Sequence, residues 1–289
     1  MKPTFHDLLA LWILEAARMR RQKLNVRDER NRSDFYDGFF EEKDFEASTL
    51  DPRSVIRRLT IAAFLSTQLA PGASVMDVGC GLGDVLAGLP ANYRLYGLEY
   101  SAESVAGAQR RLGERAVIQP GSIHQIPLTS ESLDACLCLE VLEHIADDAG
   151  AVAEMSRLLR VGGFLIAAVP YTYYWPQYRR LLGHYRHYNR DSFVHLFERN
   201  GLEAYAFLPN YPNWHQAYTR RYVGIRAQSM LFGRLFGEDS IYRFKWPWSR
   251  QPAIQKMEKK MAPLQLADAQ LDYRRLPTST FLVGRKKPA

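Results

Sequence analysis

Three glycines, each separated by one residue, follow an apolar run in the sequence VMDVGCGLG at residues 75–83. Glycines in this pattern allow a tight turn and let a ligand approach the backbone, with the N-terminus of the next helix nearby. An ordinary turn between a strand and a helix would not need three glycines. We therefore interpret Gly79, Gly81 and Gly83 as a ligand-binding loop.

Carboxylates near this loop indicate the charge of the ligand. A nicotinamide-binding loop needs its third glycine one residue further on, where this chain has Asp84. Asp77 lies just before the loop and would repel a phosphate, whereas Glu99 ends the next apolar run and can accept hydrogen bonds from both hydroxyls of a ribose. The two carboxylates favour a nucleoside that carries a positive sulfonium or ammonium group.

Histidines and aromatic residues that follow later apolar runs are candidates for the reaction itself. His144 comes after the run at 133–139, and imidazole titrates in the range that suits a general base. A histidine that only bonds the backbone at a helix start is the alternative. His184 is a second candidate base. The residues that we expect to contact the substrate, unless they only pack under a cap or brace the sheet edge, are Tyr171, Tyr174 and His187.

The elements that must position these residues follow from the order of apolar runs and helical patterns. Buried strands are predicted at 74–78, 95–98, 116–118, 133–139 and 164–169, and helices between them at 85–89, 103–112 and 149–159. Strands and helices that alternate at this interval predict a parallel sheet with helices on both faces. A helix at 191–199 and strands at 202–208 and 280–283 complete a Rossmann-like, doubly wound, mostly parallel sheet of seven strands.

The charge is distributed unevenly, and this suggests separate parts of the chain. Residues 71–169 hold six basic and 12 acidic residues, whereas 170–289 hold 20 basic and eight acidic residues. We predict an N-terminal helical cap at 1–70, a core at 71–209 and 278–289, and a helical insertion at 210–277. The insertion is basic and rich in aromatic residues, which suits either a lid over the substrate or a membrane contact.

Composition excludes several classes of protein. With 47% hydrophobic and 24% charged residues, the chain is not disordered, collagenous or a multi-span membrane protein. Its three cysteines cannot form a disulfide framework, so we expect a reducing, cytoplasmic compartment, and we expect no metal. An amphipathic helix in 1–23 either packs on its own domain, which we favour, or lies peripherally on an anionic membrane; 210–250 is the other candidate membrane contact.

A family resemblance adds to this interpretation. Residues 74–170 resemble class I S-adenosylmethionine-dependent methyltransferases, of the small-molecule branch often called type 11. The matching segments are DVGCGLG at 77–83, GLEY at 97–100, QPGSI at 119–123, IPL at 126–128, LDA at 133–135, EVLEH at 140–144 and LRVGG at 159–163. The segment GHYRHY at 183–188 also resembles one that is common in that branch.

The resemblance implies S-adenosylmethionine as cofactor and S-adenosylhomocysteine as product. The residues that it places at the methionine part, the ribose or the sulfonium are Asp77, Gly79, Cys80, Gly81, Gly83, Glu99, Leu139 and Glu140. Tyr100 and Ile123 would lie beside the adenine, and Tyr36 of the cap would cover the cofactor. Ser122 stands where the family usually has an aspartate that contacts the adenine amine, and its hydroxyl can still accept that hydrogen bond.

The acceptor is the least determined part of this prediction. We expect a hydroxyl oxygen on a sugar, lipid-linked or quinone-like small molecule, anionic or lipid-linked in character, because the C-terminal part of the chain is basic and aromatic. One alternative is a nucleic-acid methyltransferase, although the sequence contains no recognised nucleic-acid-binding motif. The other is a catalytically silent cofactor-binding scaffold at the membrane surface.

Overall fold

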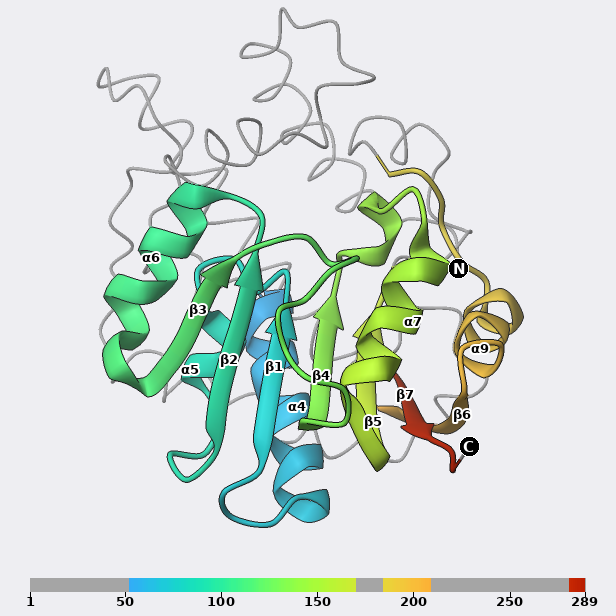
Figure 1. The fold of residues 1–289 in the computed structure, drawn as a ribbon, viewed down its shortest axis with the longest axis horizontal. Helices are drawn as coiled ribbons and strands as arrows, with labels where there is room; N and C mark the ends of the chain where they lie inside the picture. Colours follow the sequence, from blue (N-terminus) through green and yellow to red (C-terminus); the bar gives the residue numbers. More distant parts are fainter. Residues whose placement is uncertain (1–51, 170–183, 209–280, 289) are drawn as a thin grey trace, which may run out of the picture.

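The computed structural model describes residues 52–169, 184–208 and 281–288 (Figure 1). Within these ranges one mixed sheet is flanked by helices. The expectations for Tyr36, Tyr171 and Tyr174, and those for the insertion at 210–277 and for residues 1–51 of the cap, lie outside the described residues.

Seven strands form the sheet, in the order β3-β2-β1-β4-β5-β7-β6. Their bounds are β1 (Ser74–Val78), β2 (Arg94–Glu99), β3 (Ala116–Pro120), β4 (Leu133–Leu139), β5 (Leu159–Ala168), β6 (Leu202–Leu208) and β7 (Phe281–Lys286). Neighbours among β1 to β5 pair in parallel, and β7 runs antiparallel between β5 and β6. The sheet therefore confirms the predicted doubly wound, mostly parallel architecture.

In the part of the chain that the structure describes, five α-helices and two short 3-10 helices accompany the strands. Their bounds are α4 (Pro52–Gln68), α5 (Asp84–Ala87), α6 (Ala102–Leu112), η2 (Gly113–Arg115), η3 (Leu142–His144), α7 (Asp148–Leu158) and α9 (Arg190–Glu198). Side chains cap several N-termini: Ser101 accepts from the Ser104 N–H before α6, and Asp147 accepts from the Gly150 N–H before α7. Such caps satisfy backbone donors that the first helical turn leaves without partners.

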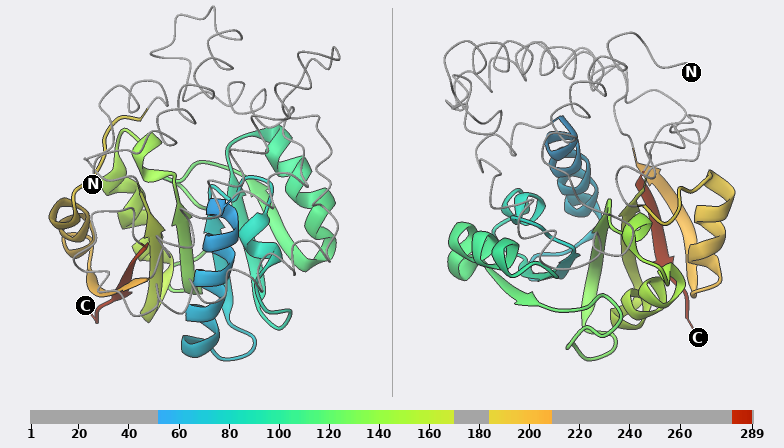
Figure 2. Two further views of the ribbon diagram at one scale, coloured as in Figure 1. Left: turned by 180° about the vertical axis from the view of Figure 1, so that it is seen from behind. Right: turned by 90° about the horizontal axis from the view of Figure 1, so that it is seen from above.

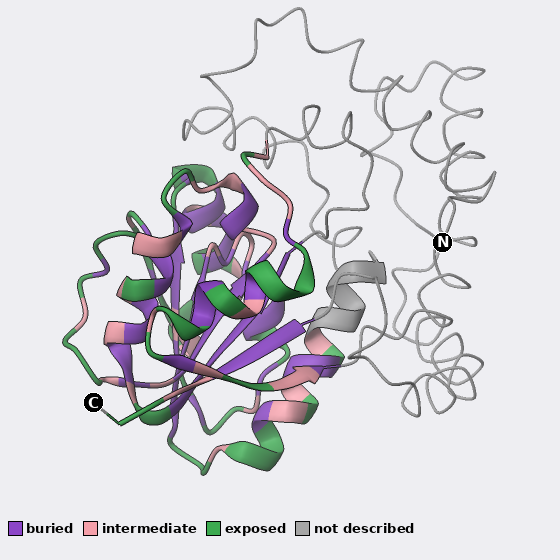
Figure 3. Cartoon of the chain, turned by 90° about the vertical axis from the view of Figure 1, so that its right-hand side faces the viewer, coloured by how far each residue is buried: buried purple, intermediate pink, exposed green. Residues whose placement is uncertain are grey.

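Each face of the sheet has its own hydrophobic cluster. Helices α4, α5 and α6 pack on one face, where Ile61, Leu86 and Ala108 join buried residues of the strands. Helices α7 and α9 pack on the other face through residues such as Met155 and Phe193. Figure 2 shows the two helical layers from behind and from above, and Figure 3 shows the buried strands between them.

Helix α4 belongs to the first of these layers. Residues 52–68 fall within the predicted N-terminal cap at 1–70, and in the structure Ile61 and Leu65 of this helix are fully buried in the cluster on the sheet. No helix in the described ranges combines the length and the apolar character that crossing a bilayer requires.

Strand β5 begins earlier than the predicted 164–169. Leu159, expected to end a helix, already pairs with Leu133, and after a register shift Phe164 pairs with Ala135. At the irregularity, a Cβ on Gly163 would lie 2.9 Å from the Arg160 carbonyl oxygen, so only glycine fits there. Gly162 and Gly163 therefore lie at a bulge inside β5. In the prediction from the sequence they came before the strand.

Candidate active site

The glycine loop connects β1 to α5 at the carboxyl edge of the sheet. Gly79, Gly81 and Gly83 have φ angles of 76°, 53° and 76°, the left-handed region that favours glycine. A Cβ on Gly79 would lie 2.5 Å from Cγ2 of Val141, and one on Gly83 would lie 2.7 Å from Cδ1 of Leu112. Backbone conformation and close neighbours thus both explain the three glycines.

Glu99 closes β2 and faces this loop. Its carboxylate accepts hydrogen bonds from the backbone N–H of Gly81 (2.7 Å), Tyr100 (2.7 Å) and Ser101 (3.1 Å). A carboxylate offers about four acceptor sites. These bonds fix the side chain and leave capacity for a further donor, such as a ribose hydroxyl.

Asp77 and Glu99 make the loop electronegative. Asp77 lies in β1 opposite Gly97 of β2 and Leu137 of β4, and its side chain is buried. Burial, followed by the charges of Asp77 and Glu99, raises the pKa of the Cys80 thiol well above its ordinary value. Cys80 therefore stays a neutral thiol at physiological pH, and the negative charges of Asp77 and Glu99, which add to the effect of burial, favour a cationic ligand.

The predicted adenine contacts lie beyond β3 and at the end of β2. Ile123 is buried, whereas Ser122 is exposed in a turn, where its hydroxyl accepts a hydrogen bond from the His124 N–H at 3.3 Å. The Tyr100 ring is 53% exposed, and an exposed aromatic ring can stack against a planar ligand. The adenine roles of these residues stay predictions.

The chain leaves β4 through a strained residue. Leu139 is buried and ends the strand, and Glu140 then adopts a φ of 59°, a left-handed conformation that non-glycine residues rarely take. The Glu140 N–H still donates to the carbonyl of Ala168 on β5 at 2.8 Å. Strained residues of this kind cluster at functional sites, and this one directs the chain from β4 into η3, beside the glycine loop.

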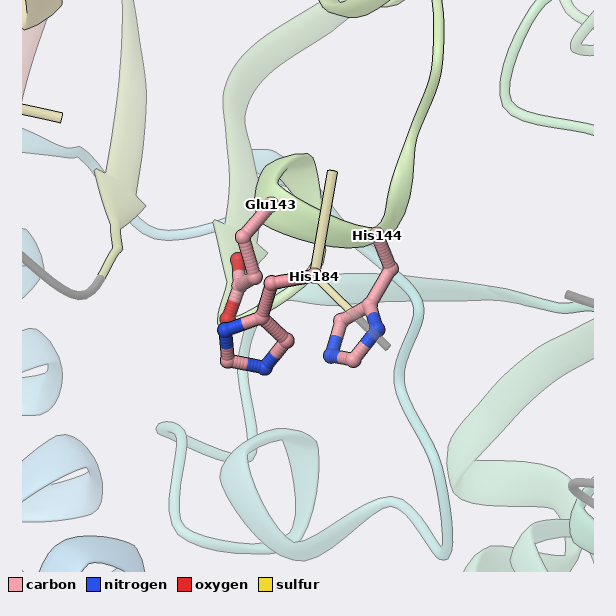
Figure 4. A group of neighbouring side chains, drawn as sticks. All are labelled: Glu143, His144 and His184. Carbon is pink, nitrogen blue, oxygen red and sulfur yellow. The ribbon is translucent and has the colours of Figure 1, made fainter. Parts of the chain in front are cut away.

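Three side chains meet just after this turn. The ligand atoms of Glu143, His144 and His184 all lie within 4.8 Å of one another, and Figure 4 shows the three side chains converging from two segments of the chain. The rings of His144 and His184 have centroids 4.5 Å apart in an edge-to-face arrangement. His187 extends the group, because its Nε2 lies 2.8 Å from Nδ1 of His184. We call these four residues the histidine cluster.

A second set of contacts holds the segment 184–188 against η3. The backbone N–H of Tyr185 donates to the carbonyl of Glu143 at 2.7 Å. The buried Tyr188 hydroxyl donates to Asp148 at 2.7 Å, and Arg186 forms an ion pair with the same carboxylate. These interactions fix the two segments that carry the histidines relative to each other.

The structure brings together candidates that the sequence named separately. His144, His184 and His187 were predicted as individual candidates, and the structure places them in one group. Glu143, which the sequence analysis did not name as a site residue, is buried with 1% exposure and belongs to that group. The signal in the sequence was its place next to His144, but its partners lie about 40 residues further on, which spacing alone does not reveal.

These residues fit a nucleoside cofactor with a positive charge. The loop is open at the backbone because its glycines carry no Cβ, Glu99 has acceptor capacity for a ribose hydroxyl, and Asp77 adds negative charge. A doubly wound sheet with such a loop after its first strand and a carboxylate after its second is typical of Rossmann-like domains that bind nucleosides.

Comparison with known proteins identifies the family of this domain. Residues 76–167 match a family described as "Methyltransferase domain". A Mycolicibacterium smegmatis protein described as a probable S-adenosylmethionine-dependent methyltransferase is 34% identical over 102 residues, which cover 34% of this chain and 38% of that protein. This segment is therefore a methyltransferase domain, and its relative in M. smegmatis is described as S-adenosylmethionine-dependent.

Other relatives differ in the atom that their names say is methylated. An O-methyltransferase of Pyrenophora dematioidea is 24% identical over 140 residues, 45% of this chain and 51% of that protein. A ubiquinone/menaquinone biosynthesis C-methyltransferase of Syntrophotalea carbinolica is 28% identical over 165 residues, 53% of this chain and 67% of that protein. The chain spans less than half the length of the first curated relatives that it matches.

Solved structures share the fold at low sequence identity. A Haloferax volcanii protein described as a methyltransferase, solved in complex with a methyltransferase activator, is 17% identical, with a TM-score of 0.56 over 91% of this chain and all of that one. A Haemonchus contortus phosphoethanolamine N-methyltransferase, solved with phosphomonomethylethanolamine and S-adenosylhomocysteine, is 15% identical, with a TM-score of 0.54 over 80% of this chain and 53% of that one. At this identity the likeness concerns the fold.

Proposed function

We propose that this protein transfers a methyl group from S-adenosylmethionine to a hydroxyl oxygen of a small-molecule acceptor. The observation that carries the proposal is the histidine cluster, whose Glu143 and His144 lie in η3, after β4, at the same edge of the sheet as the glycine loop. Val141 links the two sites, because it contacts Gly79 of the loop and stands three residues before His144. The domain thus has a nucleoside side and a titratable side that adjoin.

The residues on the nucleoside side would hold the cofactor. The glycine loop and Asp77 would contact its methionine part, and Glu99 would bind its ribose. When bound, S-adenosylmethionine supplies a methyl group on a positively charged sulfonium. The protein's main task is then to align the acceptor with that methyl group and to exclude other nucleophiles.

The titratable side favours a hydroxyl acceptor. A hydroxyl has a high pKa and reacts faster when its proton is removed during methyl transfer, whereas an amine needs less help. Glu143, His144 and His184 together provide groups that assist this removal. We assign His144 and His184 to the acceptor side on this ground, with His187 positioning His184 through the hydrogen bond between their rings.

The charge of the chain supports an anionic or lipid-linked acceptor. Residues 170–289 carry 20 basic and eight acidic residues, and ten aromatic residues fall within 210–250. A sugar, lipid-linked or quinone-like hydroxyl compound fits this composition, and a contact with an anionic membrane through 1–23 or 210–250 would bring a lipid-linked acceptor to the site. Binding to vesicles with and without anionic lipid tests the membrane contact.

Calorimetric titration with S-adenosylhomocysteine tests the cofactor assignment. We expect micromolar binding by the full chain, no binding of NAD, and loss of binding in Asp77→Ala and Glu99→Ala. Methylation assays on anionic and lipid-linked hydroxyl compounds then test the acceptor. Absence of S-adenosylhomocysteine binding to cofactor-free protein would contradict the proposal, and methylation confined to nucleic acid would replace the acceptor class.

A further inference from the structure

We propose that Glu143, His144 and His184 form a binding site for a divalent transition-metal ion. The proposal rests on the proposed function, because the ion would bind the acceptor oxygen at the acceptor side of the domain. It replaces the expectation from the sequence that the protein uses no metal. It also gives His144 the role of a ligand in place of a proton-accepting base.

The geometry brings the three ligand atoms close to coordination distance. They lie within 4.8 Å of one another, and metal–ligand bonds of about 2.0–2.2 Å in a tetrahedral site place the ligand atoms about 3.4 Å apart. Because His144 stands in η3 and His184 in the segment held against η3, small side-chain rotations close the remaining distance without moving either segment. Figure 4 shows the carboxylate and both imidazoles on the same side of η3.

The donor set indicates the kind of ion. Two imidazole nitrogens and one carboxylate oxygen suit Zn²⁺, Mn²⁺, Co²⁺ or Fe²⁺, whereas Mg²⁺ and Ca²⁺ prefer oxygen ligands throughout. Three protein ligands leave at least one position open, as in catalytic metal sites. Glu143 is 1% exposed, and coordination of a metal ion is one of the ways in which proteins stabilise a buried carboxylate.

Groups around the three ligands orient them. His187 Nε2 lies 2.8 Å from His184 Nδ1, so this hydrogen bond engages one ring nitrogen and the other ring nitrogen of His184 serves as the ligand. The Tyr185 N–H holds the backbone of Glu143 at 2.7 Å. Metal-binding histidines characteristically have such a partner on their second nitrogen, which sets the tautomer and the ring orientation.

The ion would act on the acceptor without changing its own oxidation state. A hydroxyl that coordinates the ion has a lower pKa and releases its proton to water. The acceptor oxygen then forms its bond to the methyl carbon while the bond between that carbon and sulfur breaks. The products are a methyl ether and a neutral thioether, and the positive charge of the sulfonium leaves as the proton.

Titration of the EDTA-treated full chain with ZnCl₂ tests the site directly. We expect one equivalent of Zn²⁺ to bind in calorimetry, and MgCl₂ not to bind comparably. Glu143→Gln, His144→Asn and His184→Asn should each weaken Zn²⁺ binding by about tenfold or more. His195→Asn is the matched control, because His195 is an exposed histidine on α9, away from the cluster. Co²⁺ should give visible absorption bands that are absent in the three ligand variants.

The cofactor titration separates this proposal from the proposed function. Each variant is first titrated with S-adenosylhomocysteine, whose retained binding shows that the domain is folded. Cofactor binding without Zn²⁺ binding would overturn the metal site and leave the methyltransferase proposal standing. Equal Zn²⁺ affinity in native protein and ligand variants, or equal preference for Mg²⁺, would also overturn it. Zn²⁺ binding without cofactor binding would refute the proposed function alone.

Discussion

Replacing Gly79 by alanine tests whether contact with Val141 shapes the candidate cofactor loop. The φ of Gly79 is 76°, and an L-residue in this region costs about 1–2 kcal/mol. In addition, the new Cβ would lie 2.5 Å from Cγ2 of Val141 and 3.4 Å from Cγ1. Rotation of Val141 offers little relief, because its branched side chain presents a second methyl group when the first turns away.

The expected destabilisation has two parts that a control can separate. Overpacking against Val141 adds about 1–3 kcal/mol, so Gly79→Ala should lower the free energy of unfolding by about 2–5 kcal/mol in total. Gly72 has a φ of 85° and nothing within 4 Å of an added Cβ. Gly72→Ala should therefore cost only the conformational part, about 1–2 kcal/mol.

Urea unfolding followed by far-UV circular dichroism measures the stability of both variants. In the Gly79→Ala/Val141→Ala double variant, most of the packing part should disappear. S-adenosylhomocysteine affinity should fall in Gly79→Ala and stay unchanged in Gly72→Ala. Equal stability of the two glycine variants, or no recovery in the double variant, would refute the reasoning.

Three further predictions concern other residues of the domain. Glu99→Gln places an amide donor against backbone N–H groups such as that of Gly81, and should weaken S-adenosylhomocysteine binding by about tenfold or more in calorimetry; unchanged affinity would remove Glu99 from the site. Because burial raises the pKa of Cys80, its alkylation by iodoacetamide at pH 8 should be far slower in folded protein than in urea, and rapid labelling would show that the loop opens. The hydrogen bonds from Arg157 hold the pKa of Glu154 below its usual value, so this pair stabilises the fold above the unfolded-state pKa, and the contribution is lost as the pH falls through the folded-state pKa. Arg157→Gln should thus cost about 1 kcal/mol at pH 7 and less at pH 3, and a cost independent of pH would contradict this account.

The cofactor half of the site could be predicted because it is local in sequence. The glycine loop and Glu99 lie within 25 residues, and a strand, a tight turn and a second parallel strand suffice to bring them together. Hydrophobic patterns predicted all seven strands, with differences confined to their ends. The start of β5 was missed because Leu159 continues the helical pattern of α7 while it pairs with Leu133.

The acceptor half could not be assembled in the same way. Glu143 and His184 are about 40 residues apart, and they meet because Tyr185 bonds the backbone of Glu143 and Tyr188 reaches Asp148. These contacts depend on how one segment docks on another, and no periodic pattern encodes that docking. The sequence therefore predicts the histidines as separate candidates and does not reveal that Glu143 joins them.

The backbone strain at Glu140 supports a functional role for the turn between β4 and η3. Among the described residues that carry a side chain, only Glu131 and Glu140 have a positive φ, and Glu140 stands between the glycine loop and the histidine cluster. A left-handed non-glycine residue costs about 1–3 kcal/mol, which persists only where the surroundings enforce it. The Glu140 N–H donates to the carbonyl of Ala168 on β5. The turn at Glu140 then leads to Val141, which contacts Gly79, and to η3, which contains His144. A relaxed exit from β4 would separate the two halves of the site, so we infer that the strain is retained because it holds the nucleoside side and the acceptor side together.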